Sequence, residues 1–203
     1  MNVYAETNFV LELIFAQKHI ESCENIVLLC EQKLAQLVIP AYCMVELHEK
    51  LRRQSGERVR LQSDLLRELR QLGWTVSYAD RIKSISDIAS LLVQSNDEEK
   101  ARLEQYRQRL LAITTIIALT SAILVNGSQY EKQYSLSPQD AIVYASVMDH
   151  LRQEPQIMSC FLNKNTKDFD NPDIVDELEK LEGKMIPRFY QGYEYIRTRV
   201  IRT

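Results

Sequence analysis

Glycine and proline are scarce in this sequence, with five of each among 203 residues. Linkers and disordered tails are usually rich in these two residues, so the chain contains little material for either. Its length fits one large domain, because domains typically have about 50 to 250 residues. We therefore expect a single, compact and largely helical domain over residues 1–203.

A net positive charge is also lacking, because 25 Lys and Arg residues stand against 28 Asp and Glu residues and leave a net charge of -3. Proteins that hold nucleic acid through a broad basic face usually have a strong excess of Lys and Arg. A nucleic-acid contact would therefore use a local patch. The candidate patch contains Lys50, Arg52, Arg53, Arg58 and Arg60. The alternative is a solvated helix face, since acidic residues alternate with these cations.

No apolar run is long enough to be a membrane helix. The most apolar stretch, residues 110–125, is shorter than the roughly 18 residues that a span needs, and it contains the polar residues Thr114 and Ser121. We expect this stretch to lie in a buried core helix. No signal peptide precedes the first expected strand, so we expect a cytoplasmic protein without membrane contacts.

Cysteine is rare, and its spacing carries no metal or redox motif. The four residues are Cys23, Cys30, Cys43 and Cys160. They form no CxxC pair, and no His lies at zinc-ligand spacing from them. Most of them have apolar neighbours, so we expect buried free thiols.

The sequence does contain an alternation of short β-favouring runs with longer helical patterns. The strand-like runs are residues 2–5, 37–40 and 156–162, with an edge strand near 185–187 and an extended segment at 74–78. The helical patterns cover about 9–17, 22–37, 42–72, 84–95, 95–125 and 137–151, followed by one helix from residue 171 and a last one after residue 187. This order predicts an α/β fold of three layers, with helices on both faces of a short central parallel sheet.

Local signals mark several of the expected helix ends. Ser95 and Glu98 have the spacing of a capping box, which predicts a helix start at residue 95. Residues 126–128, Asn-Gly-Ser, are typical of a turn. Ser137 is followed by a proline and then by Asp140, in the pattern of a helix N-terminus.

Four acidic residues follow strands or open helices, and an open α/β sheet places its ligand site at the carboxyl ends of the strands. They are Glu6 after the first strand, Glu46 one turn into the helix after the second, Asp140 in a first helical turn, and Asp168 after the strand that ends near Leu162. Converging carboxylates repel one another unless a divalent cation lies between them. Oxygen ligands suit Mg²⁺ or Mn²⁺ rather than zinc, so we expect such a metal site.

Each acid also has a structural alternative. Asp140 is favourable at a helix N-terminus whether or not it binds a metal. Glu6 could cap the first helix, and Asp168 could be an exposed loop acid. Glu46 lies among apolar residues, where an unpaired carboxylate is costly, but it could pair with Arg52 or the arginine beside it. The position of all four acids at one edge of the expected sheet favours the metal site.

Four segments resemble the motifs of PIN domains, in the order that the family has them. Residues 3–11 are similar to the opening strand with its acid-Thr-Asn signature, and residues 39–47 to the second strand with a helix-borne glutamate. Residues 137–145 resemble the third motif. Residues 161–169 resemble the last motif, in which a polar residue and an Asp-Phe pair close the site. The resemblance covers most of the chain and implies the same α/β fold.

Two features depart from the family pattern. The family usually has Asp at the position of Glu6, and the longer side chain shifts the carboxylate by the length of a methylene group. The interval between Glu46 and Asp140 is also longer than in small PIN domains. We interpret residues of about 51–125 as a helical elaboration that could form a dimer surface, a substrate wall or a partner-binding arm.

The resemblance implies a function, because PIN domains are metal-dependent nucleases that act mostly on RNA, and many small bacterial members are toxins restrained by an antitoxin. It implies an endonuclease for single-stranded RNA in which one or two Mg²⁺ or Mn²⁺ ions activate water and stabilise the leaving oxygen. The implied ligands are Glu6, Glu46, Asp140 and Asp168, and the implied supporting residues are Thr7, Asn8, Asn165 and Thr166. The expected partners are RNA, an antitoxin-like protein and a second copy of the chain.

Two other classes of protein remain open. A non-catalytic PIN-like module would keep the fold for binding or assembly, and both Glu6 and the lack of positive net charge are compatible with it. A phosphotransfer or nucleotide-binding α/β protein is less favoured, because the sequence has neither a Walker loop nor a GxGxxG pattern. A nuclease needs the four acids within reach of one metal site, whereas an assembly module needs an apolar patch on the inserted helices.

Overall fold

The structure is a computed structural model that describes residues 1–155, 157–165, 169 and 171–201, without the side chains of residues 79–81 and 83–87. The contacts within the chain divide it into two compact units. We call Met1–Leu47 together with Tyr106–Thr203 the sheet unit, and His48–Gln105 the helical unit. The expected organisation as one domain over residues 1–203 stays a prediction.

The sheet unit is built around a parallel sheet, in which the described residues form five strands in the order β3-β2-β1-β4-β5. The strands are β1 (Asn2–Ala5), β2 (Gln36–Pro40), β3 (Thr114–Ile117), β4 (Ser159–Leu162) and β5 (Gly183–Ile186). Val3 pairs with Leu37 of β2, and Ala5 pairs with Leu162 of β4. Every residue of β1 and β4 is buried, as in a parallel sheet that is covered on both faces. The short central parallel sheet is confirmed.

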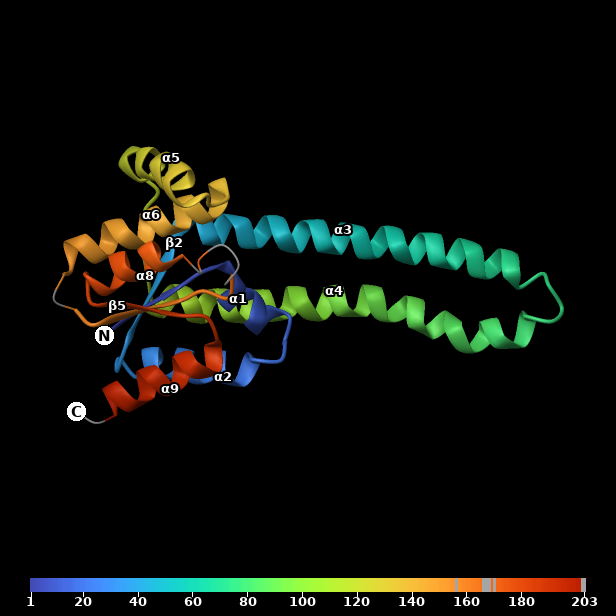
Figure 1. The fold of residues 1–203 in the computed structure, drawn as a ribbon. Coiled ribbons are helices and arrows are strands. Elements are labelled where there is room, and N and C mark those ends of the chain that lie inside the picture. Colours follow the sequence, from blue (N-terminus) through green and yellow to red (C-terminus); the bar gives the residue numbers. More distant parts are fainter. Residues whose placement is uncertain (156, 166–168, 170, 202–203) are drawn as a thin grey trace. The chain divides into compact units, whose positions relative to one another are not determined.

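Helices cover both faces of this sheet. In the sheet unit they are α1 (Thr7–Ile14), α2 (Ile20–Glu31), α5 (Ser121–Tyr134), α6 (Pro138–Gln153), α8 (Pro172–Glu179) and α9 (Phe189–Val200). α2 packs beside α9, and α5 packs beside α6. Figure 1 shows the first pair below the strands and the second pair above them. The three-layer α/β fold is therefore confirmed.

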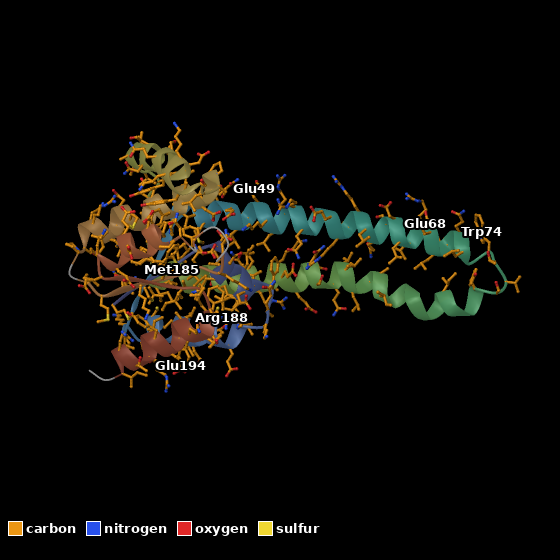
Figure 2. All side chains as sticks on the ribbon, viewed as in Figure 1. Glu49, Glu68, Trp74, Met185, Arg188 and Glu194 are labelled. Carbon is orange, nitrogen blue, oxygen red and sulfur yellow. The ribbon has the colours of Figure 1, made fainter. Side chains whose placement is uncertain are left out.

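The helical unit consists of parts of α3 (Ala41–Leu72) and α4 (Ala79–Ile113). Arg58 Nη1 donates to Glu99 Oε2 at 2.7 Å and to Asn96 Oδ1 at 3.1 Å, and both acceptor residues are buried. This charge-assisted network links the two helices. The turn between them carries Trp74, which is 86% exposed (Figure 2).

The candidate basic patch lies in this helical unit. Arg58 belongs to the network above, and Arg52 Nη2 pairs with Glu49 Oε2 at 3.0 Å. At least two cations of the patch therefore bind acids of their own unit. Neither ion pair tests whether the patch contacts nucleic acid, which stays a prediction.

The expected core helix over residues 95–125 is wrong. α4 ends at Ile113, and residues 114–117 form β3 in parallel register with β2, with Leu37 opposite Thr114. The sequence Thr-Thr-Ile-Ile is entirely β-branched, and such side chains lose rotamer freedom in a helix but pack well on a pleated sheet. The helix start at Ser95 is also wrong, because Ser95 lies inside α4 and its hydroxyl donates to Leu92 O at 2.9 Å.

Two further expectations on local structure are wrong. Residues 126–128 lie inside α5 rather than in a turn. Gly127 is there because α5 approaches α6 closely: a Cβ at this position would lie 3.4 Å from Ile142 Cγ1. Residues 74–78 form turns rather than an extended segment.

All four cysteines are buried and free, which confirms the expectation from their apolar neighbours. Burial raises the pKa of the Cys30 and Cys43 thiols to about 12, so both remain neutral near pH 7. The helices in the described part of the chain include none with both the length and the apolar character that a bilayer crossing requires.

Replacement of Gly192 by alanine tests the packing of α9 on β4. A Cβ at Gly192 would lie 2.5 Å from Cδ2 of Leu162, a fully buried residue with little space to move. We expect G192A to lower the free energy of unfolding by about 1–3 kcal/mol through overpacking, although alanine favours a helix by about 1 kcal/mol over glycine. Urea unfolding followed by circular dichroism measures this change.

The matched control is G56A in α3, where an added Cβ meets no atom within 4 Å. This variant should keep or raise helix stability, by about 0.5–1 kcal/mol. A G192A protein that is as stable as G56A would contradict the close packing of α9 on Leu162.

Candidate functional site

Glu6 leaves the end of β1 and occupies the N-cap position of α1. Its side chain makes no capping hydrogen bond to the helix. Instead, Asn8 Nδ2 donates to both carboxylate oxygens at 2.9 and 3.1 Å, and the backbone N–H of Lys164 donates to Oε1 at 3.1 Å. Glu6 is 7% exposed, so these donors hold a largely buried carboxylate at the end of the strand.

Glu46 lies one turn into α3, the helix that begins directly after β2. The hydroxyl of Thr7 donates a hydrogen bond to Glu46 Oε2. Thr7 is fully buried at the start of α1, so this bond connects the residue after Glu6 to the helix-borne acid. Arg52, one of the two alternative partners of Glu46, pairs with Glu49. The pairing of Glu46 with Arg53 stays a prediction.

Asp140 lies in the first turn of α6, and the expected helix N-terminus at Ser137 is confirmed. The backbone N–H of Asp140 donates to Ser137 Oγ at 3.2 Å, and this hydroxyl donates in turn to Asp140 Oδ2 at 2.6 Å. Asn165 Nδ2 also donates to Asp140 Oδ2, at 3.2 Å. The segment after β4 therefore contacts both Glu6, through Lys164, and Asp140, through Asn165.

Two neighbouring residues at the start of α3 lie in the electric fields of these acids. The pKa of Cys43 is raised to about 12, first by burial and then by the charges of Glu6 and Glu46, while a hydrogen bond with Thr7 opposes the shift. The pKa of Tyr42 is raised by burial and by the nearby charges of Glu46, Cys43 and Asp140. Cys43 thus lies in the fields of Glu6 and Glu46, and Tyr42 lies in the fields of Glu46 and Asp140.

The remaining predicted residues divide into two groups. Thr7, Asn8 and Asn165 make the contacts above, whereas Thr166 and Asp168 lie outside the described residues. The next described residue, Phe169, is buried with its ring edge-on to Phe161 at 5.8 Å.

The donor set of this region suits a hard divalent cation. Glu6, Glu46 and Asp140 offer carboxylate oxygens, and the nearby Cys43 thiol is kept neutral by its raised pKa. Within the described residues, no group of three or more His, Cys, Asp or Glu side chains is arranged so that it could hold a metal ion. The metal site itself, with Asp168 as a fourth ligand, therefore stays a prediction.

The sequence reasoning missed Glu12, Asn163 and Lys164. Glu12 is 1% exposed; its Oε1 accepts from the His19 N–H at 2.6 Å, and its Oε2 accepts from Lys164 Nζ at 3.0 Å. Asn163 is buried and its Oδ1 accepts from the Asn165 N–H at 2.8 Å. The apolar neighbours of Glu12 are a signal that could have found it, as they found Glu46. The Lys164 N–H donates to Glu6, and the Asn163 side chain accepts from the Asn165 N–H. Contacts of backbone N–H groups leave no pattern in the sequence from which they could be predicted.

The comparison with known families is clear. A model of the PIN domain family matches residues 3–169, which are most of the chain, and the protein belongs to this family. The resemblance of the four sequence motifs is thereby confirmed. No curated protein sequence matches the chain significantly.

Among solved structures, the crystal structure of VapBC2 from Rickettsia felis bound to a DNA fragment from their promoter is similar to this chain. The match has a TM-score of 0.50 and 12% sequence identity, and it covers 92% of this chain and 99% of the other. At this identity, the match supports the fold alone.

Replacement of Ser137 tests the N-terminus of α6 that orients Asp140. S137A removes the acceptor of the Asp140 N–H, so we expect the free energy of unfolding to fall by about 1 kcal/mol. S137N is the matched control, because Asn caps helices as well as Ser does and its amide can donate to Asp140. Urea unfolding in EDTA measures both variants. A midpoint of S137A equal to that of the wild type would disprove the cap.

Proposed function

We propose that this protein is a divalent-metal-dependent endonuclease that hydrolyses phosphodiester bonds in single-stranded RNA. The observation that carries the proposal is a set of hydrogen bonds in a chain of the PIN domain family. The neighbouring residues Lys164 and Asn165 donate to Glu6 and Asp140, and Thr7, next to Glu6, donates to Glu46. Members of this family are typically nucleases. The ends of β1 and β2 and the start of α6 supply the three acids.

Glu6, Glu46, Asp140 and Asp168 would hold Mg²⁺ or Mn²⁺, which supplies Lewis-acid activation of water and neutralises charge on the phosphodiester. The residues around the first three of these acids fix the direction of each carboxylate. Their donors are Asn8 and the Lys164 N–H for Glu6, Thr7 for Glu46, and Ser137 and Asn165 for Asp140. Such partners usually determine both metal affinity and activity.

The choice of RNA as substrate rests on the family, whose members act mostly on RNA. A single strand can present one phosphodiester to a small group of acids without the unwinding that a duplex would need. The net charge of -3 argues against a broad nucleic-acid surface, so the substrate contacts should be local.

The first test is cleavage of a fluorescent single-stranded RNA in Mn²⁺, Mg²⁺ or EDTA. We expect cleavage with either metal and none in EDTA. D140N should lower the rate by about a hundredfold or more, since even partners outside the metal ligands typically contribute about 10- to 100-fold. D149N is the matched control, because it makes the same change on the same helix and removes only a hydrogen bond from Gln153.

Equal activity of D140N and wild type would remove Asp140 from the site. If wild-type protein neither cleaves RNA nor binds Mn²⁺ in calorimetry, the non-catalytic PIN-like module becomes the better interpretation. Metal binding without cleavage would instead direct the search to another RNA or to a protein partner.

The second test concerns Glu6, where the family usually has Asp. E6D should lower the affinity for Mn²⁺ by about tenfold or more, because the shorter side chain withdraws the carboxylate from Asn8 and from the Lys164 N–H. Isothermal titration calorimetry measures the affinity, with E131D at an exposed position of α5 as the control. Tighter binding by E6D would mean that Glu6 is a weakened form of the family's aspartate.

We also propose that a protein partner restrains this activity, as an antitoxin restrains many small bacterial members of the family. The support for this step is the fold shared with VapBC2 from Rickettsia felis. The need for such a partner would explain an outcome of the first test in which the protein binds Mn²⁺ but does not cleave RNA.

A further inference from the structure

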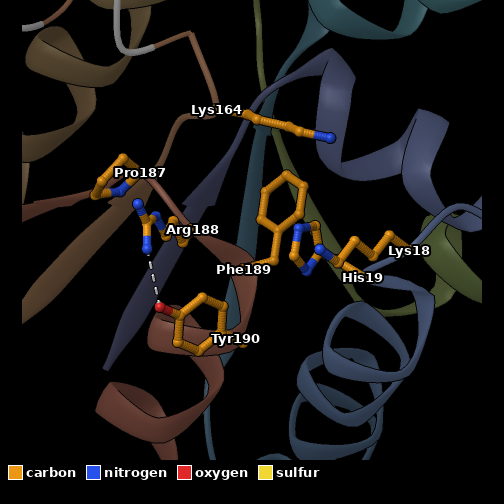
Figure 3. A pocket seen from close by; sticks show the side chains of 7 residues that line it. All are labelled: Lys18, His19, Lys164, Pro187, Arg188, Phe189 and Tyr190. Carbon is orange, nitrogen blue, oxygen red and sulfur yellow. Dashed lines mark hydrogen bonds between the residues drawn. The ribbon is translucent and has the colours of Figure 1, made fainter.

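A pocket of 590 Å³ opens in the sheet unit beside the acidic region. Its walls come from the connection between α1 and α2, from the segment after β4, and from the start of α9 (Figure 3). The lining residues that matter here are Lys18, His19, Lys164, Arg188, Phe189 and Tyr190. The volume lies within the range of about 300–1,000 Å³ that is usual for small-molecule sites.

The lining carries three permanent cations, Lys18, Lys164 and Arg188, and the described residues contribute no acidic side chain to it. In the described part of the chain, Lys18 has no ion-pair partner, and Arg188 donates only to the Tyr190 hydroxyl, at 3.2 Å. Arg58 and Arg109, by contrast, are paired with neighbouring acids. Two unneutralised cations that face one pocket favour an anionic ligand.

Aromatic rings form another wall of the same pocket. His19 and Tyr190 lie face to face, with ring centroids 6.3 Å apart and planes 28° apart. Phe189 is buried and packs edge-on against the His19 ring, with the ring centroids 6.4 Å apart, which helps to hold the His19 ring in place. Tyr190 is 43% exposed, so one of its surfaces remains available to a planar group. Bases of single-stranded nucleic acids stack on such rings.

Lys164 connects this pocket to the acidic region. Its backbone N–H donates to Glu6 Oε1 at 3.1 Å, and its Nζ donates to Glu12 Oε2 at 3.0 Å. The other oxygen of Glu12 accepts from the His19 N–H, so one buried carboxylate fixes two walls of the pocket. Because Glu12 is 1% exposed, it anchors Lys164 without placing an anion in the pocket.

We propose that this pocket binds one nucleotide of a single-stranded RNA, next to the phosphodiester held at the acidic region. Lys18, Lys164 and Arg188 bind the phosphate, and Tyr190 with His19 stacks on the base. This inference rests on the proposed function and assigns the residues that hold its substrate. Both an RNA chain and a free nucleotide carry a phosphate and a base, so both could bind such a pocket. The test is therefore designed to distinguish these two ligands.

The test measures binding of a 5′-fluorescein single-stranded RNA by anisotropy in EDTA, over a series of KCl concentrations. We expect K18Q/R188Q to bind about tenfold more weakly or worse, because each lost charge-assisted contact to phosphate is strong. The slope of log affinity against log salt should fall in magnitude by about 0.7 for each lost phosphate contact, and so by about 1.4.

The matched control is K132Q/K180Q, which removes the same charge from exposed lysines of the sheet unit that do not line the pocket. It should bind like the wild type. Stacking is tested separately: Y190A should weaken binding, whereas Y190F keeps the ring and should not. Equal affinities and slopes for K18Q/R188Q and K132Q/K180Q would overturn the proposal, as would equal binding by Y190A and Y190F.

Two comparisons distinguish this inference from other interpretations. The comparison of RNA binding with RNA cleavage separates it from the nuclease proposal, and a competition with AMP separates it from a site for free nucleotides. Binding in EDTA needs no metal, so pocket-dependent binding in a protein that fails to cleave RNA would contradict the nuclease alone. If the wild-type protein cleaves RNA but the pocket substitutions leave RNA binding unchanged, only the role of the pocket is contradicted. If AMP competes as strongly as unlabelled RNA of the same base composition, the pocket binds free nucleotides and the RNA assignment is wrong.

Discussion

The parallel pairing of β1 with β4 is the constraint on which the candidate site depends. Ala5 lies opposite Leu162, so the residues that follow them, Glu6 and Asn163, leave the sheet at the same edge. One residue further, the Lys164 N–H reaches the Glu6 carboxylate. A shift of one position in this register would turn every side chain of β1 to the other face and separate these groups. The parallel pairing of β1 with β2 brings the end of β2 to the same edge of the sheet. There α3 begins, and it carries Glu46.

The acids of this edge are held in two different ways. Glu12 meets an ammonium group, Lys164 Nζ, and the ion pair removes much of the cost of burying its charge. Asp140 accepts hydrogen bonds from Ser137 and Asn165, which are neutral, and it forms no ion pair within the described part of the chain. Neutral donors orient a carboxylate without cancelling its charge. Asp140 therefore keeps an uncompensated negative charge, as a metal ligand requires, whereas Glu12 serves as an anchor.

The sequence predicted those elements whose signals are local, and it failed where distant contacts decide. The N-terminus of α6 was predictable because Ser137 and Asp140 lie three residues apart and bond to each other. β3 was missed, since residues 114–117 continue an apolar helical pattern. Their β-branched side chains favour a strand, but the pairing with β2 decides between the two. Gly127 suggested a turn because glycine is common in turns. Its actual role is to allow α5 to approach α6, and that contact between two helices leaves no local signal. In the candidate site, the acids were predicted from their positions after strands or near helix starts, and their role as ligands stays a prediction. The contacts of Lys164 could not be predicted in this way.

The placement of cations beside the acids bears on how a chain of net charge -3 could hold RNA. A group of carboxylates repels a phosphodiester, so substrate contacts require positive charge close to the acids. Lys18 and Arg188 supply it on two walls of the pocket, and the backbone of Lys164 contacts Glu6. At physiological salt, charges act over about 8 Å, so such a small group attracts RNA only at short range. A flexible single strand can bring its phosphates that close, whereas a duplex must first unstack and unpair a nucleotide, at a cost of a few kcal/mol. The cations of this pocket, rather than the net charge, are therefore what the proposed single-stranded substrate would contact.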